Sequence, residues 1–179
     1  MSKVKIKDKT FVTSIPEAEI LKRISTVAAR INADMEGKTP VFLAVLNGSF
    51  MFASDLVRMI TVPCEVSFVK FSSYSGTTST GSVKQLIGLS GSLKGRDVII
   101  VEDIVETGYT MREMLNQVEA LEPNSVSVCT LLLKPDCLRV PLDIKYAVME
   151  IPNDFIVGYG LDYDQQGRNL RDIYTIVSD

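Results

Sequence analysis

Short, uninterrupted runs of apolar residues recur along the chain, and many of their members are β-branched. The runs cover residues 41–46, 66–71, 98–101 and 126–133. Runs of this length with almost no polar positions are typical of strands that are covered on both faces. We therefore predict a largely parallel β-sheet built from these four segments.

Three longer stretches before and between these runs carry apolar residues at helical spacing. Their apolar stripes consist of Ile20, Leu21, Ile24, Val27, Ala28 and Ile31; of Phe52, Ala53, Leu56, Val57 and Ile60; and of Met111, Met114, Leu115, Val118 and Leu121. Each stripe defines one apolar face of an amphipathic helix. Alternating strands and helices predict an α/β fold with right-handed crossovers and helices on both faces of the sheet.

Two of the expected helices are preceded by capping signals. Ser14 with Glu17, and Thr110 with Glu113, match the capping box, in which the side chains and backbone N–H groups at a helix start satisfy each other. We predict that the first and third helices begin at these residues.

A polar stretch of small residues, SSYSGTTSTGS at positions 72–82, interrupts the pattern. It contains too few apolar side chains to pack by itself, so it is expected to form a mobile loop. A long hairpin connection and a lid over an active site are about equally compatible with it.

The composition is that of an ordinary globular protein. A chain of 179 residues with 46 % hydrophobic and 23 % charged residues can bury a sizeable core, and we predict a single domain over residues 1–179. The formal net charge of −3 argues against a nucleic-acid or anionic membrane surface. Its apolar runs are too short to span a membrane and the N-terminus lacks a signal-peptide core, so a cytoplasmic location is expected.

The residue types that are missing also restrict the chemistry. The chain contains no histidine, which excludes the commonest general base and any histidine-containing metal cluster. Cys64, Cys129 and Cys137 are odd in number and lack CxxC spacing, so neither a disulfide framework nor a zinc site is expected. Acid–base work would fall to carboxylates, lysine or tyrosine.

The segment VIIVEDIVETGYT, residues 98–110, combines a buried strand, two acids and a helix start. Glu102 and Asp103 are expected at the carboxyl end of the strand, where open α/β sheets bind ligands. Thr107 and Thr110 add hydroxyl donors to the backbone N–H groups of a helix start, which favour a phosphate, and Gly108 permits its close approach.

An ordinary strand–turn–helix junction with solvated acids is the alternative interpretation of this segment. It contains neither a GxxxxGK[ST] loop nor a GxGxxG fingerprint after a strand. Two acids before a phosphate cradle instead suggest a ligand that has a vicinal diol beside a phosphate. Ribose 5-phosphate has that shape.

The segment VIIVEDIVETGYTM resembles the signature of the hypoxanthine-guanine phosphoribosyltransferases. The resemblance extends to LNGSF (46–50), similar to the family's pyrophosphate loop; FSSY (71–74), similar to its lid; LLLK (131–134); and IPNDFIVGYGLDYDQQGRNL (151–170). It implies a type I phosphoribosyltransferase fold, with a mostly parallel sheet, a small hood and a mobile lid loop.

The resemblance also implies a role for each matching residue. The ribose and 5-phosphate would be held by Glu102, Asp103, Ile104, Val105, Thr107, Gly108, Tyr109 and Thr110, and the pyrophosphate by Leu46, Asn47, Gly48, Ser73, Tyr74 and Arg168. Lys134 would donate to the purine 6-oxo group, Phe155 would stack on the ring and the Ile156 backbone would contact its edge. Asp162 would border the purine and, with Glu102 and Asp103, hold Mg²⁺.

Further implications concern single positions. In the family, the peptide bond between Leu46 and Asn47 is cis, which is rare before a residue other than proline. Glu106 stands where most relatives have an aspartate that acts in acid–base catalysis, so its carboxylate lies one methylene further out. Tyr109 replaces a lysine of some relatives, which leaves less positive charge at the phosphate.

The implied activity is purine salvage, in which the phosphoribosyl group of phosphoribosyl pyrophosphate is transferred to hypoxanthine, and to guanine, to give IMP and GMP. The resemblance also suggests a homodimer or homotetramer, with neither nucleic acid nor membrane as a partner. Three alternatives stay open: a xanthine-preferring enzyme, a non-catalytic regulator that senses phosphoribosyl pyrophosphate, and a nucleotide-binding subunit of a larger assembly.

Overall fold

A six-stranded sheet forms the centre of the described chain. The structure is a computed structural model that describes residues 2–74, 83–89 and 91–177. The strands of the central sheet are β3 (Val41–Leu46), β4 (Glu65–Tyr74), β5 (Val83–Ile87), β6 (Asp97–Val105), β7 (Ser125–Leu133) and β8 (Tyr146–Glu150). They lie in the order β5-β4-β3-β6-β7-β8, and all neighbours are parallel except β4 and β5. The predicted parallel sheet is confirmed.

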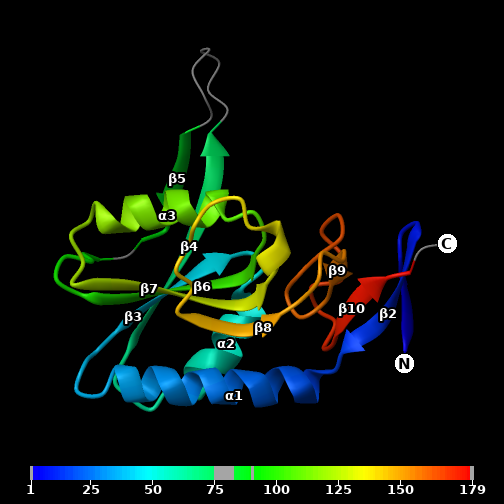
Figure 1. The fold of residues 1–179 in the computed structure, drawn as a ribbon, viewed down its shortest axis with the longest axis horizontal. Helices are drawn as coiled ribbons and strands as arrows, with labels where there is room; N and C mark the ends of the chain where they lie inside the picture. Colours follow the sequence, from blue (N-terminus) through cyan, green and yellow to red (C-terminus); the bar gives the residue numbers. More distant parts are fainter. Residues whose placement is uncertain (1, 75–82, 90, 178–179) are drawn as a thin grey trace.

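Helices cover both faces of this sheet, as predicted. The helices α1 (Glu17–Asp34) and α2 (Phe50–Arg58) lie on one side and α3 (Tyr109–Glu119) on the other (Figure 1). The apolar run 41–46 forms β3, and its alternate residues face opposite sides of the sheet. Phe42 and Ala44 belong to the core under α1 and α2. Their neighbours Val41 and Leu43 belong to the core under α3.

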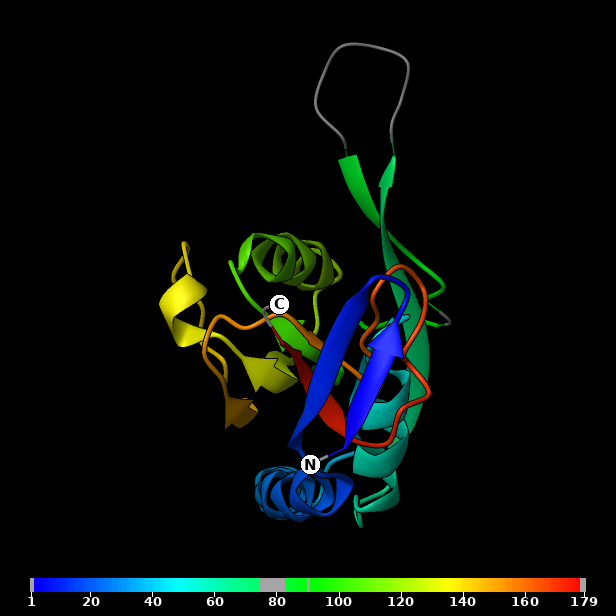
Figure 2. The same cartoon turned by 90° about the vertical axis from the view of Figure 1, so that its right-hand side faces the viewer.

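A second, smaller sheet forms the hood at one end of the molecule. The strands β1 (Lys3–Ile6), β2 (Lys9–Ile15), β10 (Ile173–Ile176) and β9 (Ile156–Val157) pair in this order, and all pairs are antiparallel. Figure 2 looks onto this hood and shows strands from both ends of the chain side by side. Its small core contains Ile6, Phe11, Val157 and Tyr174.

The capping predictions were wrong at both helices. Ser14 lies within β2, and its Oγ donates to the carbonyl of Ile173 at 3.1 Å. The first turn of α1 is capped instead by Asp172, whose Oδ1 accepts from the Glu17 N–H at 2.8 Å. Helix α3 begins one residue before Thr110, because Gly108 in left-handed geometry takes the N-cap position.

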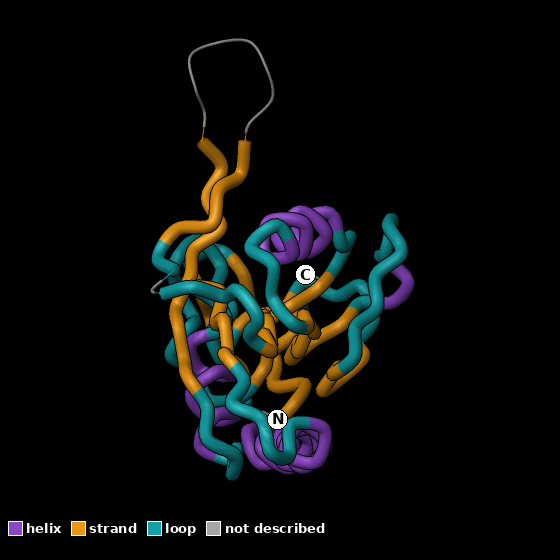
Figure 3. The backbone as a smooth tube through the Cα atoms, turned by 90° about the vertical axis from the view of Figure 1, so that its left-hand side faces the viewer, coloured by secondary structure: helices purple, strands orange, loops and turns teal. Residues whose placement is uncertain are grey.

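The polar stretch at 72–82 is only partly described. Residues 72–74 extend β4 and pair with β5, in the register Ser72↔Gln85 and Tyr74↔Val83, so a loop was the wrong prediction for them. The backbone of β5 supplies hydrogen-bond partners that local composition does not reveal. Figure 3 shows the two strands leaving the body of the fold together. Residues 75–82 of the expected lid lie outside the described residues.

The remaining expectations concern cysteines and membranes. Cys64, Cys129 and Cys137 are all free thiols, as expected. Among the helices of the described ranges, none combines the length and apolar character needed to cross a membrane.

Candidate active site

The turn from β6 to α3 shapes one cavity at the carboxyl edge of the sheet. Gly108 adopts a φ of +85°, and a Cβ there would lie 2.7 Å from Leu142 Cδ1 and 2.8 Å from Val140 Cγ2. Only glycine fits this position without a shift of its neighbours. The cavity measures about 240 Å³ and is lined by Glu102, Asp103, Ile104, Val105, Glu106, Thr107, Gly108, Thr110 and Met111. Eight of the residues predicted from the sequence are thus brought together.

Two adjacent carboxyl groups enter this cavity from the end of β6. Glu102 Oε1 accepts from the Asp103 N–H at 3.1 Å, and Asp103 Oδ1 accepts from the Ile104 N–H at 3.0 Å. Burial raises the pKa of Glu102 well above its ordinary value, and the hydrogen bond and charge of Asp103 raise it further. In the free protein the pair therefore retains a proton more readily than two separate carboxylates would.

The loop after β3 lies directly against the acid pair. The Leu46–Asn47 peptide is cis, as the family resemblance implies. A Cβ on Gly48 would overlap the carboxylate of Asp103, and a Cβ on Gly160 would overlap the Gly48 carbonyl. The absence of two side chains therefore allows three separate segments to meet: the β3–α2 loop, the end of β6 and the C-terminal tail.

A second cavity, of about 220 Å³, adjoins the first. It is lined by Asp103, Ile104, Glu106, Lys134, Phe155, Ile156, Leu161 and Asp162. The four residues predicted to contact a purine, Lys134, Phe155, Ile156 and Asp162, all belong to this lining. Asp103, Ile104 and Glu106 line both cavities.

Lys134 is a buried cation in the wall of the second cavity. The side chain is 5 % exposed, and its Nζ forms an ion pair with Oε1 of Glu106, whose side chain is 50 % exposed. Asn153 Oδ1 lies 3.5 Å from the same Nζ. The Lys134 N–H donates to the Val105 carbonyl at 3.0 Å, which fixes the base of this side chain to the end of β6.

Asp162 and Arg168 are joined by an ion pair. Arg168 Nη2 lies 2.6 Å from Asp162 Oδ1, and Nη1 donates to the Gly160 carbonyl at 2.9 Å. Because Gly160 packs on Gly48, the guanidinium lies near the loop after β3. Arg168 lines neither of the two cavities described above but a larger, third cavity whose lining also includes Phe50.

Three other residues predicted from the sequence lie at the start of α3 and at the end of β4. Tyr109 is 60 % exposed at the first position of α3 and does not line the first cavity. Ser73 and Tyr74 lie at the end of β4, where only the backbone is described.

The donor set fits Mg²⁺ only with help from a ligand. Among residues 2–74, 83–89 and 91–177, no cluster of three or more acidic or thiol side chains could hold a metal alone. Glu102 and Asp103 nevertheless place two carboxyl groups at the cavity edge. Mg²⁺ is commonly held by one or two carboxylates together with substrate phosphates, so these residues fit that mode of binding.

Sequence reasoning missed Leu161, which lines the second cavity, and Asn153, which contacts the lining residue Lys134. Leu161 contributes an apolar wall next to Asp162, and Asn153 contacts the lysine. Asn153 stands two positions before Phe155, so a polar side chain within the segment expected to bind the purine was the signal that could have found it.

The comparisons with known proteins agree with this geometry. The "Phosphoribosyl transferase domain" family matches residues 13–164. The chain is 41 % identical to a hypoxanthine-guanine phosphoribosyltransferase of Streptococcus agalactiae over 155 residues, 86 % of each chain. It is 40 % identical to the hypoxanthine phosphoribosyltransferase of Haemophilus influenzae over 167 residues, which is 91 % of this chain and 93 % of that protein.

A crystal structure supports the same assignment. The hypoxanthine-guanine phosphoribosyltransferase of Bacillus anthracis superposes with a TM-score of 0.86 at 37 % identity, covering 97 % of this chain and 100 % of that one. Sequence and fold thus lead to one family over nearly the whole length. The chain belongs to the type I phosphoribosyltransferases, among the hypoxanthine and hypoxanthine-guanine phosphoribosyltransferases.

Proposed function

We propose that this chain acts in purine salvage by transferring the 5-phosphoribosyl group of phosphoribosyl pyrophosphate to hypoxanthine, and to guanine, with release of pyrophosphate. The observation that carries the proposal is the shared wall between the two cavities. A ribose 5-phosphate in the first and a base in the second would meet beside Asp103 and Glu106. A transferase needs this arrangement, because the anomeric carbon and the attacking nitrogen must be held in contact.

The first cavity suits the ribose 5-phosphate. Backbone N–H groups at the start of α3, with the hydroxyls of Thr107 and Thr110, would bind the phosphate, since the N-terminus of a helix favours an anion. Glu102 and Asp103 would accept hydrogen bonds from the ribose hydroxyls. Tyr109 carries no positive charge, so binding of the 5-phosphate would rely on backbone N–H groups and the two threonines.

The second cavity suits a 6-oxopurine. Lys134 would donate to the 6-oxo group, Phe155 would stack on the ring and the Ile156 backbone would bind its edge. Glu106 would accept the purine proton as the nitrogen attacks. The ion pair of Glu106 with Lys134 must open for this, and the half-exposed glutamate is the partner that is free to move.

Three segments would stabilise the departing pyrophosphate: the loop Leu46, Asn47 and Gly48; the residues Ser73 and Tyr74; and Arg168. Mg²⁺, held by Glu102, Asp103 or Asp162 together with substrate oxygens, would neutralise negative charge on the leaving group. Charge neutralisation matters because the transition state resembles an oxocarbenium ion that separates from an anion. Closure of the segment at 72–82 would exclude water from this cation.

A direct assay tests the proposal. The protein is mixed with Mg²⁺, phosphoribosyl pyrophosphate and one of hypoxanthine, guanine, xanthine or adenine, and nucleotide formation is followed. We expect product with hypoxanthine and guanine and little with adenine, because the Lys134 ammonium can donate to an oxo group but not to an amino group. Dominant activity with xanthine would support the xanthine-preferring alternative, and no product with any base would contradict the proposal in favour of a regulator or subunit.

Assembly and location belong to the same proposal. We expect a homodimer or homotetramer in the cytoplasm, with small-molecule substrates as the ligands and neither nucleic acid nor membrane as a partner. Light scattering of the purified protein measures the oligomeric state directly.

A further inference from the structure

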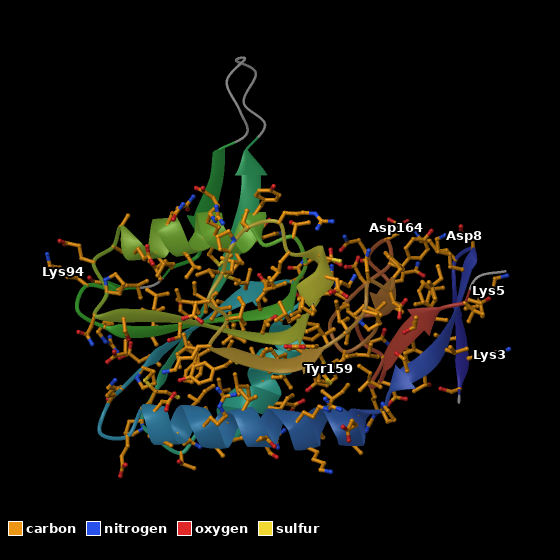
Figure 4. All side chains as sticks on the ribbon, viewed as in Figure 1. Lys3, Lys5, Asp8, Lys94, Tyr159 and Asp164 are labelled. Carbon is orange, nitrogen blue, oxygen red and sulfur yellow. The ribbon has the colours of Figure 1, made fainter. Side chains whose placement is uncertain are left out.

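Two tight turns lie side by side at the far end of the hood. One joins β1 to β2 and contains Lys7 and Asp8; the other follows Asp162 and contains Asp164. Figure 4 shows Asp8 and Asp164 close together there. Lys7 forms an ion pair with Asp164, and the Tyr163 hydroxyl donates to Asp8 Oδ1 at 2.8 Å. The N-terminal hairpin thus holds the turn that follows the site residue Asp162.

The ring of Tyr163 connects these turns to the second cavity. The rings of Tyr163 and Phe155 are 5.8 Å apart between centroids and meet edge to face at 89°. Phe11 lies 6.2 Å from each of them and is fully buried in the hood core. Phe155 is supported by two rings, while 46 % of its surface remains exposed and it lines the second cavity.

Two backbone hydrogen bonds close the turn that begins at Tyr163. The Tyr163 N–H donates to the Gln166 carbonyl at 2.9 Å, and the Gln166 N–H donates back at 3.1 Å. Between them, Asp164 and Gln165 both take positive φ, of 48° and 68°. This is the geometry of a tight hairpin turn.

The Tyr163 ring also contacts a lysine of the N-terminal hairpin. Lys9, with Nζ 5.7 Å from the centroid of the Tyr163 ring, adds a cation–π contact.

We propose that Tyr163 is a positioning residue for purine binding: anchored by Asp8, it holds the ring of Phe155 in the orientation that stacks on the base. The inference rests on the proposed function, because it requires Phe155 to contact a purine. A half-exposed phenylalanine without this support would lose side-chain freedom when the base binds, and that loss would weaken binding.

The test compares the KM values of the two substrates. Tyr163→Leu removes the edge-to-face contact but keeps an apolar side chain, and we expect the KM for hypoxanthine to rise about fivefold, the size of a lost aromatic pair. The KM for phosphoribosyl pyrophosphate and kcat should stay within about twofold, because Phe155 does not line the first cavity. Tyr163→Phe keeps the ring and loses only the bond to Asp8, so it should raise the KM for hypoxanthine by less than Tyr163→Leu does, and its rise measures what the Asp8 anchor adds.

Tyr146→Phe is the matched control. Its hydroxyl donates to Asp34 Oδ2 at 2.6 Å, so this variant also loses a tyrosine–aspartate bond, but between β8 and the end of α1. It should leave the KM for hypoxanthine unchanged. Thermal unfolding of all variants shows whether any effect on KM follows from lost stability instead.

The possible outcomes are distinguishable. An unchanged KM for hypoxanthine in Tyr163→Leu would overturn the inference, and so would an equal rise in the KM of both substrates, which indicates a general disturbance. If the unmodified protein forms no nucleotide, the proposed function itself is contradicted and the inference falls with it.

Discussion

At the scale of single residues, Glu106 and Lys134 form a pair with unequal freedom. The lysine side chain is 5 % exposed and the glutamate side chain 50 %. A buried cation keeps its position only when other groups satisfy it, and here the Asn153 amide oxygen remains nearby at 3.5 Å. We therefore expect the glutamate to turn toward the purine while the lysine stays in the wall.

Replacing Glu106 tests its assigned role. Glu106→Gln keeps the size of the side chain and removes its capacity to accept a proton. We expect kcat to fall by about 10² to 10⁴, the usual contribution of general acid–base catalysis, with the KM of both substrates nearly unchanged. Steady-state kinetics at neutral pH measure this, with Glu113→Gln on the exposed face of α3 as control. Wild-type turnover in Glu106→Gln would remove Glu106 from the acid–base role.

The raised pKa of Glu102 predicts a pH dependence of stability. Burial and the adjacent Asp103 favour the protonated form in the folded protein, so folded molecules bind more protons than unfolded ones above the ordinary value of 4.5. The contribution of this group is fully present below that pH. It is lost as the pH rises through the raised pKa.

Glu102→Gln should remove this dependence, because its neutral side chain does not titrate. We expect its free energy of unfolding to fall less steeply between pH 4.5 and neutrality than that of the unmodified protein. Urea unfolding at a series of pH values measures the two slopes in the absence of ligands. Parallel slopes would show that Glu102 is ionised in the folded state throughout this range.

At the scale of elements, the start of α1 depends on a residue 155 positions away. Asp172, just before β10, accepts from the Glu17 N–H, while Ser14, which has the sequence pattern of a cap, serves the hood sheet. The first turn of α1 therefore gains this cap only when the hood has docked onto the rest of the fold.

Asp172→Ala should destabilise the protein by about 1 kcal/mol, the usual effect of losing an N-cap. Hydrogen exchange at the Glu17 amide should accelerate in this variant and stay protected in Ser14→Ala, whose hydroxyl bonds Ile173 and not the helix. Faster exchange in Ser14→Ala alone would restore the capping box as the correct description.

Gly108, at the turn into α3, has a positive φ and close neighbours around its Cβ position. Gly108→Ala places a methyl group against Leu142 and Val140 and strains a left-handed residue, so stability should fall by about 1–3 kcal/mol. The KM for phosphoribosyl pyrophosphate should rise, because the phosphate cradle is displaced. Gly37→Ala is the control, since Gly37 also has positive φ but nothing lies within 4 Å of its Cβ position. Equal effects of the two changes would show that the contacts around Gly108 are unimportant.

At the scale of the whole molecule, parallel strand order assembles the site. The carboxyl ends of β3, β6 and β7 lie at one edge of the sheet, which places the cis peptide, the acid pair and Lys134 together. The hood lies at one end of the sheet (Figure 1), and the C-terminal tail contributes Phe155 and Asp162 to the second cavity. That residues 1–179 make a single domain stays a prediction.

The elements and the local part of the site were predictable from the amino-acid sequence alone. Uniform apolar runs and helical stripes carry their information within a few residues, so the strands β3, β4, β6 and β7 and all three helices could be predicted. The stretch from Glu102 to Thr110 was predictable for the same reason, because strand end, turn and helix start are contiguous.

Contacts between residues far apart in the sequence depend on how the elements pack in three dimensions. Glu106 and Lys134 are 28 positions apart, and Glu17 and Asp172 are 155 apart. Local sequence patterns carry no information about such contacts, because the contacts arise from the order of strands in the sheet and from the docking of the hood. The same holds for Tyr163, whose hydroxyl reaches a turn at the opposite end of the chain. The sequence thus specified the chemistry available, and long-range packing specified the partner of each group.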